Sequence, residues 1–343
     1  MGLESNISFS SHKWKKGKYN LITDVPNVFV GHVTLKDDVR KINTGVTAIL
    51  PHNGNIFQEK VMAGVSIING FGKSVGLMQI DELGTIETPI IMTNTFGVGT
   101  ALNSLVKYMI SQNEDIGMTT GTVNCVVTEC NDARLNDIRG LHVKEEDVLN
   151  AISNADVVFE EGDVGAGTGM CCLGFKGGIG SSSRVIPIDG KDYNIGALVL
   201  SNFGSSGNLV LEGDRIGRRI EDKVCSKKDE GSIVIVIATD IPLSERQLKR
   251  VAKRATISLG RVGSYIGNGS GDISIAFTTA NNQKHYSDTN IIDIKMFYDE
   301  NIDCVFEATV EAVEESIVSS LLHSKNMTSG FRIESINSLK EYL

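Results

Sequence analysis

The segment Asp229-Glu230-Gly231-Ser232-Ile233-Val234-Ile235-Val236-Ile237 passes from two acidic residues into an unbroken apolar run. Alternating isoleucine and valine make both faces of this run apolar, which is typical of a strand that is buried on both sides of its sheet. Such a strand needs a layer of structure over each face. The simplest interpretation of Gly231 and Ser232 is a surface turn that leads into the strand.

The rest of the chain supplies candidates for those layers. Apolar side chains spaced as on one face of a helix predict helices over 102–109 and 310–321, and a capping box of Ser244 and Gln247 predicts the start of a third. Strands mixed with helices indicate an α/β or α+β protein. No repeat or linker interrupts residues 20–343, so we expect a single domain over 1–343. Further strands are predicted at residues 45–50, 89–93, 124–128, 195–200 and 272–279.

Composition argues against several classes of protein. The net charge of -9, without any run of Lys and Arg, leads us to expect no nucleic-acid partner. Residues 1–20 are polar and no stretch approaches the roughly 18 apolar residues of a membrane span, so we expect no membrane association and a cytoplasmic location. The cysteines form no CxxC pair and the histidines no HxxxH or HExxH pattern, so neither a metal site nor a cofactor is expected.

Residues 161–169, with the sequence EGDVGAGTG, superficially resemble a dinucleotide-binding loop. Their glycines lack the GxGxxG spacing, and no convincing helix pattern follows them. A tight structural loop is therefore favoured over a phosphate site.

A sharper interpretation of the opening segment is that Ser232 attacks the carbonyl carbon of Gly231. The attack converts the peptide bond to an ester and needs a preceding residue that tolerates strained backbone geometry, as glycine does. Hydrolysis of the ester would leave Ser232 with a free α-amino group, whose reference pKa is about 8. One residue would then hold both the nucleophile and the base that activates it.

A second glycine-rich turn, Gly267-Asn268-Gly269-Ser270-Gly271-Asp272-Ile273, also leads into an apolar run. Ser270 and Asp272 are two residues apart, so in an extended segment both side chains project to the same side. Ser, Gly, Asn and Asp also dominate ordinary turns, and a generic turn is the alternative interpretation.

These strings, together with others in the same order, resemble the L-aminopeptidase D-esterase family, the DmpA-like aminopeptidases that include β-aminopeptidases. The likeness runs from about residue 20 to 320, and its specificity comes from the ordered set. The matching strings are LITDVP (21–26), VGH (30–32), NTGVT (43–47), VTECND (127–132), LND (135–137), EGDVGAGTGM (161–170), GFKGGIGSSSR (174–184), LVLSNFG (198–204), GS (231–232) and GSGD (269–272).

The resemblance implies an α+β fold, a four-layer αββα sandwich related to N-terminal-nucleophile hydrolases. It also implies autoproteolysis between Gly231 and Ser232, into an alpha subunit (1–231) and a beta subunit (232–343). The family's nucleophile falls on Ser232, and its supporting serine and acid fall on Ser270 and Asp272. The oxyanion asparagine falls on Asn202, and the acid that binds the substrate's amino group falls on Glu129.

Two positions depart from the family pattern. The acid after the supporting serine is often glutamate but here is the shorter Asp272, and the site two residues beyond Glu129 is often aromatic but here is Asn131. Asn131 is therefore left out of the catalytic assignment, and we expect a substrate preference that differs from that of better known members.

The resulting expectation is a serine aminopeptidase, amidase or esterase that releases small L-, D- or β-amino acids from short peptides, amides or esters through an acyl-enzyme on Ser232. The resemblance also implies a homo-oligomer, a tetramer of processed protomers. Two alternatives stay open. One is an acyltransferase of the ornithine acetyltransferase type, which typically cleaves before threonine, and the other is an unprocessed, non-catalytic binding protein.

Overall fold

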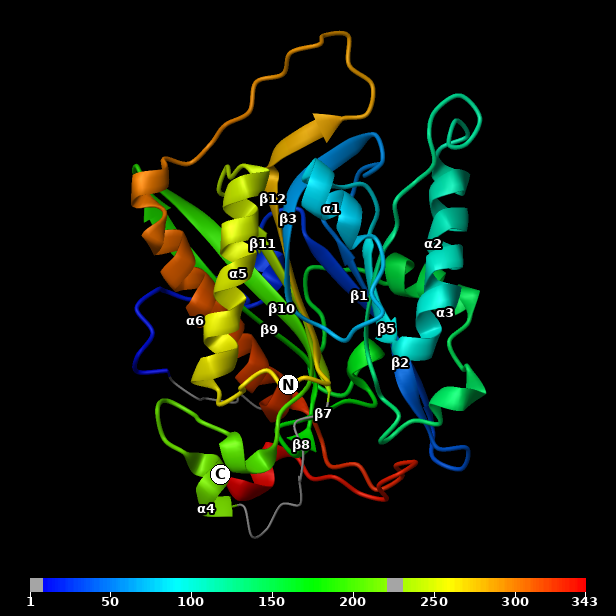
Figure 1. Ribbon diagram of the computed structural model, residues 1–343, viewed down its shortest axis with the longest axis vertical. Helices are drawn as coiled ribbons and strands as arrows, with labels where there is room; N and C mark the ends of the chain where they lie inside the picture. The colour runs from blue at the N-terminus through cyan, green and yellow to red at the C-terminus, as the bar shows by residue number, and fades with distance from the viewer. Residues whose placement is uncertain (1–8, 221–230) are drawn as a thin grey trace.

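Two β-sheets lie face to face between two layers of helices in a computed structural model of the chain, which describes residues 9–220 and 231–343 (Figure 1). Asp229 and Glu230 of the opening segment lie outside the described residues. The four-layer αββα arrangement that the resemblance implied is confirmed.

The larger sheet has six strands in the order β4-β3-β12-β11-β10-β9. Neighbours run antiparallel except β11 and β12, which are parallel and lie at the centre. A parallel central pair brings the N-terminal ends of both strands to the same edge of the sheet. The strands are β3 (Glu59–Gly70), β4 (Thr85–Ile86), β9 (Gly178–Ile188), β10 (Lys191–Asn202), β11 (Ser232–Thr239) and β12 (Gly271–Lys284).

The smaller sheet has four strands in the order β1-β2-β5-β6. A two-stranded hairpin, β7 (Cys171–Cys172) with β8 (Phe175–Lys176), forms a third sheet of its own. The strands of the smaller sheet are β1 (Phe29–Asp37), β2 (Ile42–Leu50), β5 (Ile90–Asn94) and β6 (Val126–Cys130).

Helices cover the outer face of each sheet. Helices α5 (Glu245–Arg261) and α6 (Asp303–His323) pack on the six-stranded sheet, and α2 (Val98–Gln112) and α3 (Glu145–Ser153) pack on the four-stranded sheet (Figure 1). Within residues 9–220 and 231–343 the other helices are α1 (Leu77–Leu83), α4 (Ile216–Ile220) and 3-10 turns at Ile22–Asp24, Thr95–Gly97, Ile138–Gly140, Gly165–Gly167, Ser206–Asn208, Asp299–Asn301 and Leu339–Tyr342.

The opening segment explains why β11 needs cover on both sides. Ile233, Ile235 and Ile237 pack into the apolar core under α5 and α6. Val234 and Val236 point to the opposite face and pack into the core between the two sheets. All eight residues of β11 are buried, so the double-sided cover predicted from the sequence is confirmed.

Glycines let the helices approach the larger sheet closely. A Cβ atom on Gly180 of β9 would lie 2.0 Å from the carbonyl oxygen of Ser316 in α6. A Cβ on Gly64 of β3 would lie 2.3 Å from the backbone nitrogen of Lys249 in α5. The sequence pattern indicates neither β9 nor β3 as a strand, because glycine breaks the apolar pattern by which strands are recognised.

Two local predictions, the capping box at Ser244 and the tight glycine loop, are confirmed by the structure. The Ser244 side chain accepts a hydrogen bond from the Gln247 N–H at 3.3 Å, and α5 begins at the next residue. The glycine loop is buried from Gly165 to Thr168 and packs against both sheets, as a tight structural loop should. None of the helices in the described part of the chain combines the length and hydropathy of a membrane span.

Candidate active site

The predicted site residues come from four strand ends that meet at one edge of the sandwich. Ser232 is the first residue of β11 and pairs in register with Asn202, the last residue of β10. Asp272 is the second residue of β12, and Ser270 lies just before that strand. Glu129 comes from the other sheet, near the end of β6. All of these side chains are buried, so residues far apart in sequence form one enclosed site.

A cavity of about 310 Å³ opens at this edge. Its volume is at the lower end of the range for small-molecule sites, about 300–1,000 Å³. Its lining combines the predicted nucleophile with charged side chains of both signs. The lining residues are Phe71, Lys73, Thr95, Glu129, Asn131, Ala133, Arg134, Asn202, Gly231, Ser232, Gly269 and Arg332.

The junction of Gly231 and Ser232 is held by one backbone amide. The Gly271 N–H lies 3.1 Å from Ser232 Oγ and 3.2 Å from the carbonyl oxygen of Gly231, and it donates to both. The nucleophilic oxygen and the carbonyl it would attack are therefore oriented by the same donor. A fixed backbone donor at that oxygen can stabilise the negative charge that develops during attack.

Position 231 has no room for a side chain. A Cβ atom there would lie 1.8 Å from the carbonyl oxygen of Asn202 and 3.1 Å from the Cα of Phe203. Close packing against the end of β10 therefore demands glycine at this position. The glycine before the serine was predicted from its tolerance of strain, and the structure adds this steric reason.

Ser270 and Asp272 form a hydrogen-bonded pair behind Ser232. Ser270 Oγ donates to Asp272 Oδ1 at 2.6 Å, and the same oxygen accepts the Ile233 N–H at 3.0 Å. The Asp272 carboxylate thus reaches the backbone next to the nucleophile despite being shorter than glutamate. This arrangement fixes the start of β11 relative to the turn before β12.

Asn69, at the end of β3, holds that turn in place. Its side-chain amide donates to the carbonyl oxygens of Gly267 and Asn268, both at 3.2 Å, and also to that of Ser270. The residue lies opposite Asp272 in the antiparallel register of β3 and β12, next to a register shift. Asn69 was not among the predicted site residues, because a lone asparagine at a strand end gives no signal until its cross-strand partner is known.

Asn202 has hydrogen bonds at both ends of its amide. Its Oδ1 accepts the Cys171 N–H at 2.9 Å, and its Nδ2 donates to the carbonyl oxygen of Asn131 at 2.9 Å. These two contacts determine which way the amide points. An amide nitrogen carries two hydrogens, so Nδ2 retains one donor for a ligand in the cavity. Asn131, excluded from the catalytic assignment, therefore acts on the site through its backbone.

Glu129 presents a carboxylate to the cavity although only 2% of the residue is exposed. Its Oε1 accepts the Lys73 N–H at 2.8 Å, and its Oε2 accepts the Thr95 hydroxyl. Neither donor is a charged group, so the negative charge of this carboxylate is solvated by dipoles. Such a group suits the binding of a substrate ammonium.

Cys130, next to Glu129, is buried and unsuited to act as a nucleophile. Burial, with the nearby Glu129 and Asp272 carboxylates, holds the pKa of its thiol well above the ordinary value. A thiol that stays protonated attacks carbonyls poorly. Ser232 is therefore the better nucleophile candidate at this edge of the sheets.

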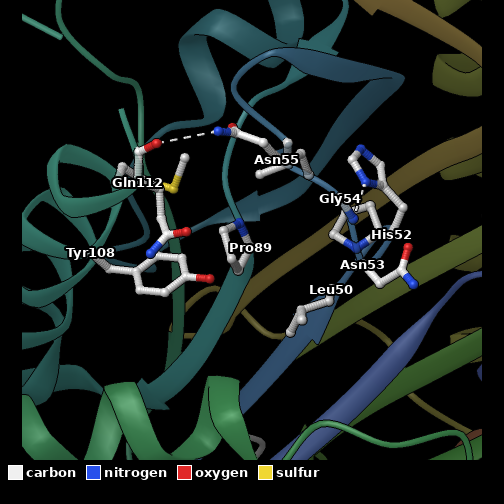
Figure 2. A pocket seen from close by; sticks show the side chains of 11 residues that line it. Leu50, His52, Asn53, Gly54, Asn55, Pro89, Tyr108 and Gln112 are labelled. Atoms are coloured by element: carbon white, nitrogen blue, oxygen red, sulfur yellow. Dashed lines mark hydrogen bonds between the residues drawn. The ribbon is translucent and has the colours of Figure 1, made fainter. Parts of the chain in front are cut away.

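A separate pocket of about 190 Å³ lies where the 50–56 turn meets Pro89 and α2 (Figure 2). His52 in this pocket has both ring nitrogens engaged by the backbone, with Nδ1 accepting the Gly54 N–H at 3.0 Å and Nε2 lying 2.7 Å from the Glu59 carbonyl oxygen. Both ring nitrogens of His52 are thus occupied in hydrogen bonds that stabilise the turn. None of the predicted site residues lines this pocket.

The αββα sandwich with a nucleophile candidate at a strand start identifies the class as hydrolases of the N-terminal-nucleophile fold. Peptidase family S58 matches residues 20–332, and the chain belongs to this family. β-Peptidyl aminopeptidase BapA from Sphingosinicella microcystinivorans is 37% identical to the chain. The alignment covers 93% of this chain and 86% of that protein.

Solved structures agree with this assignment. The PH0078 protein from Pyrococcus horikoshii OT3 is 53% identical with a TM-score of 0.91, covering 95% of this chain and 93% of that one. The L-aminopeptidase D-Ala-esterase/amidase from Ochrobactrum anthropi, described as a variant of the Ntn hydrolase fold, is 36% identical with a TM-score of 0.87, covering 96% of each chain. The predicted family, fold and enzyme class, a serine aminopeptidase of the N-terminal-nucleophile type, are confirmed. The comparisons thus favour the peptidase over the acyltransferase alternative.

Proposed function

We propose that the chain, as a single αββα domain, cleaves itself between Gly231 and Ser232. Ser232 Oγ bonds to the carbonyl carbon of Gly231, the bond from that carbon to the Ser232 nitrogen breaks, and the hydroxyl proton moves to that nitrogen. Water then hydrolyses the ester, leaving a carboxylate on Gly231 and a free hydroxyl on Ser232. The products are subunits of residues 1–231 and 232–343.

The observation that carries the proposal is the shared donor at the junction. The Gly271 N–H contacts both Ser232 Oγ and the carbonyl oxygen of Gly231, which are the two oxygens that react. As the carbonyl oxygen gains negative charge, this donor strengthens its hydrogen bond to it. The lack of space for a Cβ at position 231 supports the same step, because close packing against Asn202 fixes the position of the Gly231 backbone next to the nucleophile.

In the processed enzyme, we infer that the α-amino group of Ser232, with an ordinary pKa of about 8, accepts the hydroxyl proton. Ser232 Oγ then attacks the substrate's carbonyl carbon, and the free hydrogen on Asn202 Nδ2 is directed at the oxyanion. Glu129 binds the substrate ammonium, and Ser270 with Asp272 keeps the new N-terminus in position. The proton returns to the leaving amine, and water releases the amino acid from the acyl-enzyme.

The substrates we propose are short peptides, amides and esters with small L-, D- or β-amino acids at the N-terminus. The names of the relatives support this range, since they include a β-peptidyl aminopeptidase and an L-aminopeptidase with D-Ala-esterase/amidase activity. The limited volume of the cavity agrees with short substrates.

A homo-oligomer, predicted as a tetramer, also remains a proposal. The segment after β12 projects from the body of the molecule, and its Ile291 and Met296 are 85% and 57% exposed (Figure 1). Exposed apolar side chains on a projecting segment favour an intermolecular contact. Light scattering of the purified protein measures the state directly. A cytoplasmic location and the absence of a nucleic-acid partner stay predictions from composition.

Mass spectrometry of the purified protein tests the proposed cleavage. We expect two fragments, the second beginning at Ser232, and a single uncleaved chain for Ser232→Ala. Amino-acid nitroanilides should be hydrolysed by the processed protein and not by Ser232→Ala. Full activity from an intact chain would exclude this mechanism, and an intact chain without activity would favour the non-catalytic binding protein.

A further inference from the structure

Two arginines share the cavity with the nucleophile candidate. Arg134 follows β6 and is half-buried, and Arg332 belongs to the C-terminal segment beyond α6 and is exposed. The N–H groups of Arg332 and Ile333 donate to the carbonyl oxygen of Arg134 at 2.8 and 3.2 Å. The backbones of the two arginines are therefore adjacent, although about 200 positions separate them in sequence.

The segment that carries Arg332 is held in place by several contacts. Met327 and Ile336 exchange backbone hydrogen bonds of 2.9 Å and pack with Leu135 in a small apolar core. Asn43 Nδ2 donates to the Ser329 carbonyl oxygen at 3.2 Å. A side chain delivered by an anchored turn can serve a binding site, since little ordering entropy is lost when a ligand arrives.

Neither guanidinium has an acidic partner among residues 9–220 and 231–343. Arg184 illustrates the contrast, because it is buried and pairs with Glu311 at 3.1 Å and Glu315 at 2.6 Å. The cavity lining thus contains three cationic side chains, Lys73 and the two arginines, and Glu129 as its carboxylate. A ligand that complements this lining carries an ammonium at one end and a carboxylate at the other.

We propose that Arg134 and Arg332 form a receptor for the C-terminal carboxylate of a dipeptide whose ammonium lies at Glu129. This inference rests on the proposed function and narrows its substrate class to dipeptides with a free carboxylate. Guanidinium groups match carboxylates in geometry and stay charged at all relevant pH values. An extended dipeptide is about 7 Å long, so both of its charges fit within a small cavity.

The test compares a dipeptide with its C-terminal amide on the processed enzyme. The N-terminal residue of the dipeptide is chosen as the one whose p-nitroanilide the enzyme hydrolyses fastest. Hydrolytic activity is thus established before the dipeptide is tested. We expect kcat/KM to be about 10- to 100-fold higher for the free dipeptide, the range of a charge-assisted hydrogen bond. Arg134→Gln should abolish most of this preference by raising KM for the dipeptide.

Arg332→Gln should raise the dipeptide KM by a smaller factor, about tenfold or less, because solvent screens an exposed charge. In both variants kcat/KM for the dipeptide should fall more than kcat/KM for the nitroanilide, since the nitroanilide has no carboxylate. Arg139→Gln is the matched control, because Arg139 is exposed and does not line the cavity. Salt should weaken the preference in the wild type and in this control.

The outcomes distinguish a failure of the proposed function from a failure of the carboxylate receptor. Absence of nitroanilide hydrolysis would contradict the proposed function. Normal nitroanilide hydrolysis with equal kcat/KM for the dipeptide and its amide would contradict the carboxylate receptor alone. A loss of activity in Arg134→Gln that is equal for all three substrates would also overturn it, since that pattern indicates a structural role.

Discussion

The backbone N–H of Gly271 donates a hydrogen bond to the Oγ of Ser232 across 3.1 Å. This contact links the first residues of the parallel strands β11 and β12, so the geometry of the nucleophile candidate depends on how two strands align. A Cβ on Gly271 would lie 2.6 Å from the Cα of Gly72 and 3.0 Å from Ser232 Oγ. The close approach that places the donor therefore also requires glycine.

Gly231→Ala should slow self-cleavage strongly. The new methyl group would lie 1.8 Å from the carbonyl oxygen of Asn202, so the junction must move away from the Gly271 donor. We expect processing to slow by about 100-fold, the cost of displacing a reacting group by about 1 Å. Fragment appearance over time, followed on denaturing gels, measures the rate. Gly260→Ala is the control, since a Cβ there meets no atom within 4 Å. Wild-type cleavage in Gly231→Ala would refute the steric requirement.

Glu129→Gln should weaken substrate binding and leave processing intact. The amide can still accept the Lys73 N–H but lacks the charge that attracts an ammonium. We expect KM for aminoacyl nitroanilides to rise about 10- to 100-fold, as for loss of a charged hydrogen bond. Steady-state kinetics on the processed variant provide the measurement. An unchanged KM would show that the substrate amine binds elsewhere. Glu146→Gln, on the exposed first turn of α3, is the control.

Asn69→Asp should impair both cleavage and turnover. A carboxylate has the same shape as the amide but cannot donate to the carbonyl oxygens of Gly267, Asn268 and Ser270. The turn that carries Ser270 and Gly271 loses its alignment, and we expect kcat to fall about 10- to 100-fold with little change in KM. Asn282 lies on the neighbouring strand β12 and is exposed, so Asn282→Asp should behave as wild type. A variant whose KM rises while kcat is unchanged would assign Asn69 to substrate binding instead.

Asp132 should make stability depend on pH in an unusual direction. Burial raises the pKa of its carboxyl from 3.8 to about 7, and its Oδ2 has no hydrogen-bond partner in the described part of the chain. Between these two pH values the folded protein holds a proton that the unfolded chain has released. This group therefore lowers the free energy of unfolding as the pH rises from about 4 to 7.

Asp132→Asn removes that contribution, which over the full window is on the order of 4 kcal/mol. Urea denaturation at pH 5, 6 and 8 should show the variant gaining stability relative to wild type as the pH rises. Other titrating groups, including His32 whose pKa burial lowers to about 4, cancel in the difference between the two proteins. If the difference in unfolding free energy between variant and wild type does not change with pH, Asp132 is already ionised in the folded protein at pH 5.

The sequence by itself determined the strand at 232–239 and the need to cover both of its faces. Its uninterrupted apolar run is a local property of the residues, and so are the capping box at Ser244 and the apolar helix stripes. The family resemblance brought the αββα sandwich and the choice of Ser232, Ser270, Asp272, Asn202 and Glu129. The structure brings these residues to one edge, and their chemical roles remain predictions.

Only the tertiary structure decided the contacts that no local pattern encodes. The hydrogen bond from the Gly271 N–H to Ser232 depends on the alignment of the parallel strands β11 and β12. The hydrogen bonds of Asn69 to the turn before β12 depend on the register of β3 against β12. The Arg332 side chain reaches the cavity from a turn far along the chain. The sequence pattern did not indicate the glycine-rich strand β9, because its glycines allow a helix to pack closely and interrupt the apolar periodicity of a strand. Local patterns record which face of an element is buried, whereas a site depends on distances between elements, and packing alone sets those distances.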